Sequence, residues 1–134
     1  MKVFLDTNVL ASALATRGLC AALFESVLTE HELLASRELL AELRRILANK
    51  LRIPAETADA FLTLIGTNAT ILTTPAEFSA GIPDPDDAPL IAAALAGCVE
   101  CFVTGGKALL DLGTFAGIPV ISPRRFWELT RHGR

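Results

Sequence analysis

Residues 3–8 read VFLDTN, three apolar residues followed directly by an acid, a hydroxyl and an amide. A short apolar run bounded by polar residues is typical of a strand that is buried on both faces. Similar runs at 33–35, 70–73, 102–104 and 119–121 alternate with helical patterns. Strands that alternate with helices predict a parallel sheet joined by right-handed crossovers. We therefore expect an α/β protein, a three-layer α/β/α fold with a short parallel sheet.

Apolar stripes and capping residues mark the helices. Helices are predicted at 19–30, 37–49, 54–68, 88–97 and from about 124. Ser36 is a natural N-cap for the second helix, Pro54 fits the first turn of the third, and Gly97 fits the C-cap of the fourth. Residues 75–86 are rich in proline and are expected to form a loop. With no repeat and no long linker, residues 1–134 are predicted to form a single domain.

The composition excludes several classes of protein. The 134 residues carry a formal net charge of −3, and 51% of them are hydrophobic. A disordered chain would have fewer apolar residues, and a general polyanion binder would be basic. The apolar stretch at 88–99 is too short to cross a hydrocarbon core of about 30 Å. The acid at position 6 interrupts any signal-peptide core, so we expect a cytoplasmic protein with no membrane partner.

The three cysteines are an odd number, which makes a disulfide framework improbable. Cys98 and Cys101 have C-x-x-C spacing, but they lead into a predicted strand, whereas a redox pair begins a helix. A zinc site would need two further ligands. We expect these cysteines and Cys20 to be small buried hydrophobes.

Acidic residues stand at predicted junctions between strands, loops and helices. Asp6 follows the first strand, and Asp84 and Asp87 precede the helix at 88–97. Glu42 lies in the helix after the second strand, about 100° from the centre of its apolar stripe. Each acid has a structural explanation, because Asp6 and one acid of 84–87 can cap a helix and Glu42 can pair with Arg44 or Arg45.

A shared site explains these acids together. Ligands of doubly wound sheets bind beyond the carboxyl ends of the strands, where Asp6, Glu42 and Asp87 would approach one crevice. Three adjacent carboxylates repel one another unless a hard divalent cation such as Mg²⁺ or Mn²⁺ binds among them. Such an ion lowers the pKa of a bound water and stabilises a leaving alkoxide. This is the chemistry of phosphodiester hydrolysis.

Four segments in this order resemble the motifs of the PIN domain family, in particular of toxin components of toxin–antitoxin pairs. The segments are 3–10, 36–43, 84–97 and 102–110, and the resemblance covers essentially the whole chain. It implies a Mg²⁺- or Mn²⁺-dependent endoribonuclease with a three-layer α/β/α fold. It also implies RNA as substrate, a cognate antitoxin as partner, and a homodimer or a higher oligomer.

The resemblance assigns roles to four acids and two polar supports. The catalytic acids are Asp6, Glu42, Asp84 and Asp87, of which Asp6, Glu42 and Asp87 are metal ligands, and the supports for ligands or substrate phosphate are Asn8 and Thr104. The family places a fourth motif acid where this chain has Gly106, and Asp111 is five residues further on. A one-metal enzyme, a slow enzyme and a binding fold that no longer cuts RNA all remain open.

Two alternatives compete with the nuclease. The segment FLDTN also resembles the nucleophile motif of haloacid-dehalogenase-type phosphatases, but Asn8 stands where that motif has a second aspartate. The stronger alternative, favoured by Gly106, is a catalytically impaired PIN domain that binds RNA or protein.

Basic and aromatic residues are compatible with either a nuclease or a binding module. The basic residues form two groups, Arg44, Arg45, Lys50 and Arg52, and then Arg124, Arg125, Arg131 and Arg134. Phosphate contacts from them would position a strand without reading its sequence. Ordinary solvated charges are the preferred explanation of the C-terminal group. Phe126 and Trp127 are expected to pack against the sheet, since stacking on RNA bases would require exposed rings.

Overall fold

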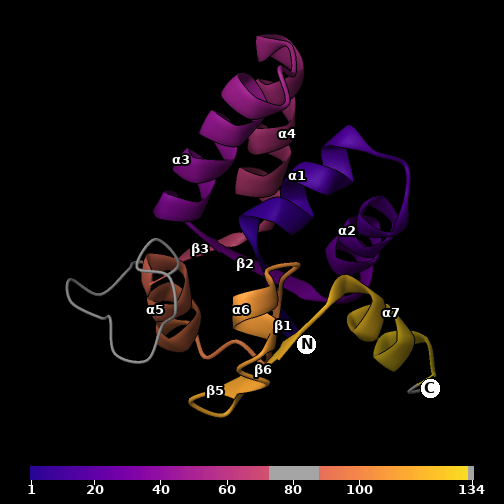
Figure 1. Cartoon of the computed structure of the whole chain (residues 1–134). Helices are drawn as coiled ribbons and strands as arrows, with labels where there is room; N and C mark the ends of the chain where they lie inside the picture. The colour runs from indigo at the N-terminus through magenta and orange to yellow at the C-terminus, as the bar shows by residue number, and fades with distance from the viewer. Residues whose placement is uncertain (73–87, 133–134) are drawn as a thin grey trace.

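The computed structural model describes residues 1–72 and 88–132 (Figure 1), so the loop predicted at 75–86, with Asp84, and the neighbouring Asp87 lie outside the described residues. Within these ranges the strands are β1 (Lys2–Leu5), β2 (Glu32–Ser36), β3 (Thr70–Leu72), β4 (Cys101–Val103), β5 (Thr114–Phe115) and β6 (Ile118–Ile121). The helices are α1 (Thr7–Ala15), α2 (Leu19–Glu30), α3 (Arg37–Arg45), α4 (Ala55–Asn68), α5 (Ala88–Ala96), α6 (Lys107–Leu110) and α7 (Pro123–His132), and a π-helical turn, η1 (Ile46–Lys50), continues α3.

The strands form one sheet in the order β3-β2-β1-β4-β6-β5. Every pairing from β3 to β6 is parallel, as predicted, so the α/β/α expectation is confirmed. The sheet is mixed, however, because β5 pairs with β6 in antiparallel orientation. Ala116 and Gly117 turn this hairpin with φ of 50° and 86°, and two positive φ values match the twist of a tight hairpin. The order reverses between β1 and β4, which makes their carboxyl ends the switch point of the sheet.

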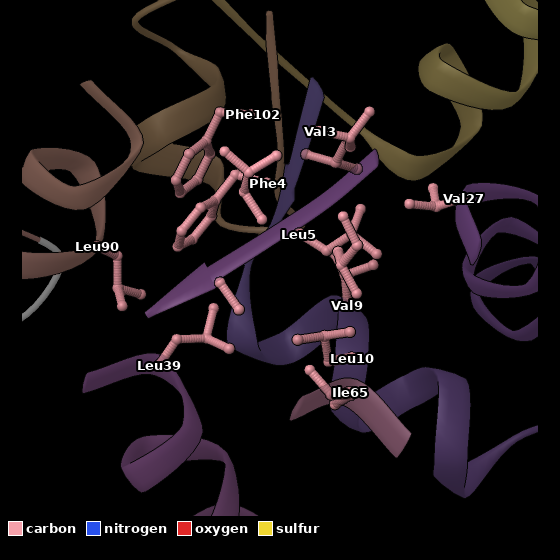
Figure 2. Close-up of a cluster of buried hydrophobic side chains, with 14 of the residues drawn as sticks. Val3, Phe4, Leu5, Val9, Leu10, Val27, Leu39, Ile65, Leu90 and Phe102 are labelled. Atoms are coloured by element: carbon pink, nitrogen blue, oxygen red, sulfur yellow. The ribbon is translucent and has the colours of Figure 1, made fainter. Parts of the chain in front are cut away.

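Apolar side chains on both faces of β1 form the core (Figure 2). The Phe4 ring stacks on Phe102 of β4, with centroids 5.2 Å apart and planes at 9°. Because side chains alternate along a strand, Leu5 points to the other face, toward Val9 and Leu10 of α1 (Figure 2). Burial on both faces accounts for the high apolar content of the chain. In the view of Figure 1, α1, α3 and α4 lie above β2 and β3, and α5 lies below these two strands.

The helix predicted at 37–49 is present, but its last turn changes geometry. The backbone N–H of Leu39 donates to Ser36 Oγ at 3.2 Å, so Ser36 is the predicted N-cap. The apolar stripe is fully buried at Leu39, Leu43 and Leu47. Glu42, beside that stripe, is half-buried, as its position on the helix predicts.

The prediction for the cysteines is wrong in part. Cys101 is buried, and burial raises the pKa of its thiol to about 12. Cys20 is half-buried, whereas Cys98 is exposed, in a turn where its φ is 54°. A turn residue in this left-handed conformation is directed by its backbone rather than by the apolar character of its side chain. All three thiols are free.

No single helix in the described ranges is long and apolar enough to span a membrane. Helices α1 and α2 meet the length and hydropathy criteria only as a pair, and they are bent by 108° relative to each other.

Candidate active site

The candidate site lies at the switch point of the sheet. Asp6 is the first residue after β1, and Thr104 is the first residue after β4. The backbone N–H of Asp6 donates to Val103 O at 2.8 Å, which continues the β1–β4 pairing up to the site. Two neighbouring strands therefore deliver two polar side chains to one point, as the doubly wound hypothesis predicts.

Hydrogen bonds hold both oxygens of the Asp6 carboxylate, which is only 5% exposed. Oδ1 accepts from the backbone N–H of Thr7 at 2.7 Å, so Asp6 does cap α1. Oδ2 accepts from the hydroxyl of Thr104 at 2.6 Å. The capping role and a site role are therefore compatible, because each uses a different oxygen.

Burial raises the pKa of the Asp6 carboxyl above 3.8. The hydrogen bonds from Thr104 and from Thr7 N–H oppose this shift, and the negative charge of Glu42 adds to it. The net pKa is raised, which means that the folded protein disfavours the charged form of Asp6. A cation between Asp6 and Glu42 would reverse that preference.

The charge of Glu42 thus reaches Asp6, although the two are 36 positions apart in the sequence. The alternative that Glu42 serves only to pair with a neighbouring arginine is wrong. Arg44 instead binds Asp59 of α4, with Nη1 and Oδ1 2.7 Å apart, and the described residues include no ion pair of Glu42 or Arg45. Glu42 is available to the site.

Gly106 adjoins the Asp6–Thr104 pair. Its backbone N–H donates to Thr104 Oγ1 at 3.0 Å while that hydroxyl donates to Asp6, so the three groups form a short hydrogen-bonded chain. Its φ of −75° and ψ of 118° are open to any residue. A Cβ at this position would meet Thr104 Oγ1 at 3.3 Å, and that contact is tight but tolerable. A larger side chain is therefore compatible with the backbone here.

Two other residues considered for the site, Asn8 and Asp111, have exposed side chains. Asn8 is exposed in the first turn of α1, and Asp111 is exposed at the end of α6. Across residues 1–72 and 88–132 there is no group of three acidic, histidine or cysteine side chains able to hold a metal ion. The structure thus joins Asp6 and Thr104 by a hydrogen bond, and Glu42 lies close enough for its charge to raise the pKa of Asp6.

The sequence analysis missed one buried polar group next to Asp6 in the chain. Thr7 Oγ1 is buried and has no hydrogen-bond partner among residues 1–72 and 88–132. An unsatisfied buried hydroxyl is costly, so a partner outside these residues would stabilise it. Its only sequence signal is its position directly after Asp6.

The prediction that Phe126 and Trp127 pack within the fold is tested by their burial. Phe126 is buried, and the half-buried Trp127 ring is covered by the Arg131 guanidinium, 4.1 Å from the ring centroid. Both rings therefore pack within the protein, as predicted.

The fold and this acidic switch-point site define a PIN-like α/β/α domain. The PIN domain family matches residues 2–108, and the chain belongs to that family. A solved structure with the same fold is the crystal structure of VapBC2 from Rickettsia felis bound to a DNA fragment from their promoter. One chain of it is 17% identical with a TM-score of 0.62, and the match covers 91% of this chain and 98% of that one. No curated protein sequence matches this chain.

Proposed function

We propose that this chain is a divalent-metal-dependent endoribonuclease that hydrolyses RNA, and that it is the toxin of a toxin–antitoxin pair. The proposal depends most on one observation, the buried Asp6 carboxylate that Thr104 holds at the switch point under the charge of Glu42. Membership in the PIN domain family supports the same chemistry.

The described residues fit a hard divalent cation in part. Asp6 and Glu42 offer oxygen ligands whose mutual repulsion a cation would relieve. When bound, Mg²⁺ or Mn²⁺ would polarise a phosphate and lower the pKa of a water. Asp87 as a third ligand and Asp84 as a further acid remain proposals from the resemblance.

The residues of the chain prepare this chemistry by orientation. Thr104 and the Thr7 N–H fix the plane of the Asp6 carboxylate, so its remaining lone pairs have one direction. Glu42, from α3, brings a second carboxylate, and Asn8, exposed on α1, is proposed to contact the substrate phosphate.

The proposal extends to partners and location. The structure of VapBC2 from Rickettsia felis with promoter DNA supports by analogy an antitoxin partner, and we propose that this partner covers the candidate site. We further propose a homodimer or higher oligomer in the cytoplasm. Co-purification with the product of a neighbouring reading frame tests the partner protein. Light scattering of the purified chain tests the oligomeric state.

A catalytically impaired domain that binds RNA or protein is the second candidate. Gly106 favours it, because the position next to Thr104 has no carboxylate. Such a domain would keep the fold and the Asp6–Thr104 hydrogen bond but would have a weakened metal site.

Cleavage of single-stranded RNA by the purified chain with Mn²⁺ separates these functions. The nuclease proposal expects cleavage that EDTA stops and that Asp6→Asn removes, with Asn8→Ser as a milder variant of the same loop. Cleavage that persists in EDTA or in Asp6→Asn would rule out the metal mechanism. A silent wild type that Gly106→Asp activates would establish the impaired domain instead.

A further inference from the structure

The hairpin of α3, η1 and α4 projects from the sheet, with residues 46–54 at its far end (Figure 1). Residues 44–59 carry four cations and two acids. Arg44 is neutralised by its 2.7 Å ion pair with Asp59. The other three cations, Arg45, Lys50 and Arg52, are exposed, and none has a side-chain partner in the part of the chain that the structure describes.

Arg45 ends α3, the helix that carries Glu42, Lys50 ends the η1 turn that continues α3, and Arg52 follows two residues later. Arg45 is three residues beyond Glu42, so both lie on neighbouring positions of one helix face. Arg44 lies on another face and binds α4. Lys50 is eight residues beyond Glu42, or about 12 Å at about 1.5 Å per residue. At about 3.4 Å per stacked nucleotide, that length corresponds to three or four nucleotides.

The backbone at the far end holds Arg52 in an unfavourable conformation. The π-helical turn closes with Leu51 N–H donating to Ile46 O at 3.0 Å, and Ile53 N–H donates to Leu47 O at 2.8 Å. Arg52 stands between these bonds with a φ of 53°. Glycine is the usual residue at this helix-ending position, since a side chain in the left-handed region is strained. Strained residues and π-helical turns are concentrated at functional sites.

We propose that Arg45, Lys50 and Arg52 form a phosphate-binding track for the RNA strand that extends from the crevice. This inference rests on the proposed ribonuclease function. The protein is acidic overall, with a net charge of −3, so its attraction for RNA must be local. The first of these cations lies one helical turn from Glu42. A single RNA strand could therefore bind the cations and the candidate site at the same time. The contacts position the strand and do not read its sequence.

Binding of a fluorescently labelled oligouridylate, with Ca²⁺ in place of Mg²⁺, tests the track. Each phosphate contact to a single strand contributes about 0.7 to the slope of log K against log salt, which is about fivefold in affinity at about 0.1 M salt. The double variant Arg45→Gln/Lys50→Gln should therefore bind about 25-fold more weakly, with a slope shallower by about 1.4. The matched control is Lys2→Gln/Arg17→Gln, which removes two exposed cations elsewhere and should keep wild-type affinity.

Arg52→Gly supplies a second test, because it should raise thermal stability while it lowers RNA affinity. Glycine removes the strain at φ 53°, so thermal unfolding should shift upward, while RNA affinity should fall about fivefold. A merely destabilising substitution would lower both quantities.

Equal RNA binding by the double variant and its control overturns the track, and so does a wild type that binds no oligouridylate. If the double variant loses affinity for polyglutamate but keeps that for RNA, the surface binds an acidic protein instead. Cleavage by the wild type is scored separately, so a failed track with intact Mn²⁺-dependent cleavage leaves the ribonuclease proposal standing.

Discussion

Replacing Gly106 with aspartate adds a carboxylate next to Asp6. The new Cβ would lie 3.3 Å from Thr104 Oγ1, which is itself 2.6 Å from Asp6 Oδ2. The new Cβ therefore lies within about 6 Å of Asp6 Oδ2. Two unit charges about 6 Å apart repel by about 0.7 kcal/mol in water and about 3 kcal/mol at a protein-surface dielectric constant of 20. In EDTA at neutral pH we expect Gly106→Asp to lower the free energy of unfolding by about 1–3 kcal/mol.

Urea unfolding with and without Mn²⁺ measures this effect. Because a cation that binds only the folded state stabilises it, Mn²⁺ should raise the unfolding free energy of Gly106→Asp more than that of the wild type. Gly105→Asp is the matched control, since it adds the same charge one residue earlier, where a Cβ has nothing within 4 Å. The control should change stability by less than about 0.5 kcal/mol in EDTA.

The reasoning is refuted if Gly106→Asp is as stable as Gly105→Asp in EDTA and responds equally to Mn²⁺. Gly106→Asn separates charge from shape, because it keeps the size of the side chain without its charge. A loss of stability in Gly106→Asn that equals the loss in Gly106→Asp would assign the effect to the tight contact with Thr104.

Four further predictions concern stability. Thr104→Val removes the donor to the Asp6 carboxylate and should cost about 1.5–3 kcal/mol in urea unfolding, and an unchanged midpoint would show that the bond is unimportant. Burial, the N-terminal amino group and Arg131 lower the pKa of His31 below 6.5, against the opposing charge of Glu30. Unfolding therefore takes up a proton, so stability should fall as the pH drops through 6.5, and His31→Gln should flatten that part of the urea-midpoint profile. Gly66→Ala, on an open face of α4, should raise the melting temperature through about 0.5–1 kcal/mol of helix propensity. Gly97→Ala should lower it, because the new Cβ would lie 2.6 Å from Leu72 Cδ1.

The sequence by itself predicted the local elements and their ends. Apolar runs of three or four residues marked β1, β2, β3, β4 and β6, and Ser36 marked the start of α3. These signals are local, since they depend on side-chain alternation, helical spacing and a hydroxyl beside free amides. Helix α1, strand β5 and helix α6 were not predicted. Strand β5 and helix α6, with two and four residues, are too short to show a period, whereas α1 was considered only as a helix that Asp6 could cap.

The sequence predicted which residues belong to the candidate site, but it predicted only some of the contacts among them. Asp6 and Glu42 were selected from their positions after a strand and beside an apolar stripe, and Thr104 from the family resemblance. The structure joins Thr104 to Asp6 by a hydrogen bond, and the charge of Glu42 raises the pKa of Asp6. Asn8 was predicted with equal support and is exposed. The orphaned Thr7 hydroxyl could not be predicted, because its burial depends on side chains that pack around it from other elements.

Tertiary structure decided which charges are free and which are paired. The sequence offers Arg44 and Arg45 as equivalent neighbours, but the packing of α4 against α3 brings Asp59 to Arg44 alone. In the same way, the order of the strands brings Thr104 to Asp6, 98 positions away in the sequence. The fold also lets the negative charge of Glu42 raise the pKa of the Asp6 carboxyl. Propensity and periodicity act over a few residues, whereas pKa values and ion pairs depend on distances that only the folded chain defines. The sequence thus determined which groups the site can draw on, and the fold determined which of them meet.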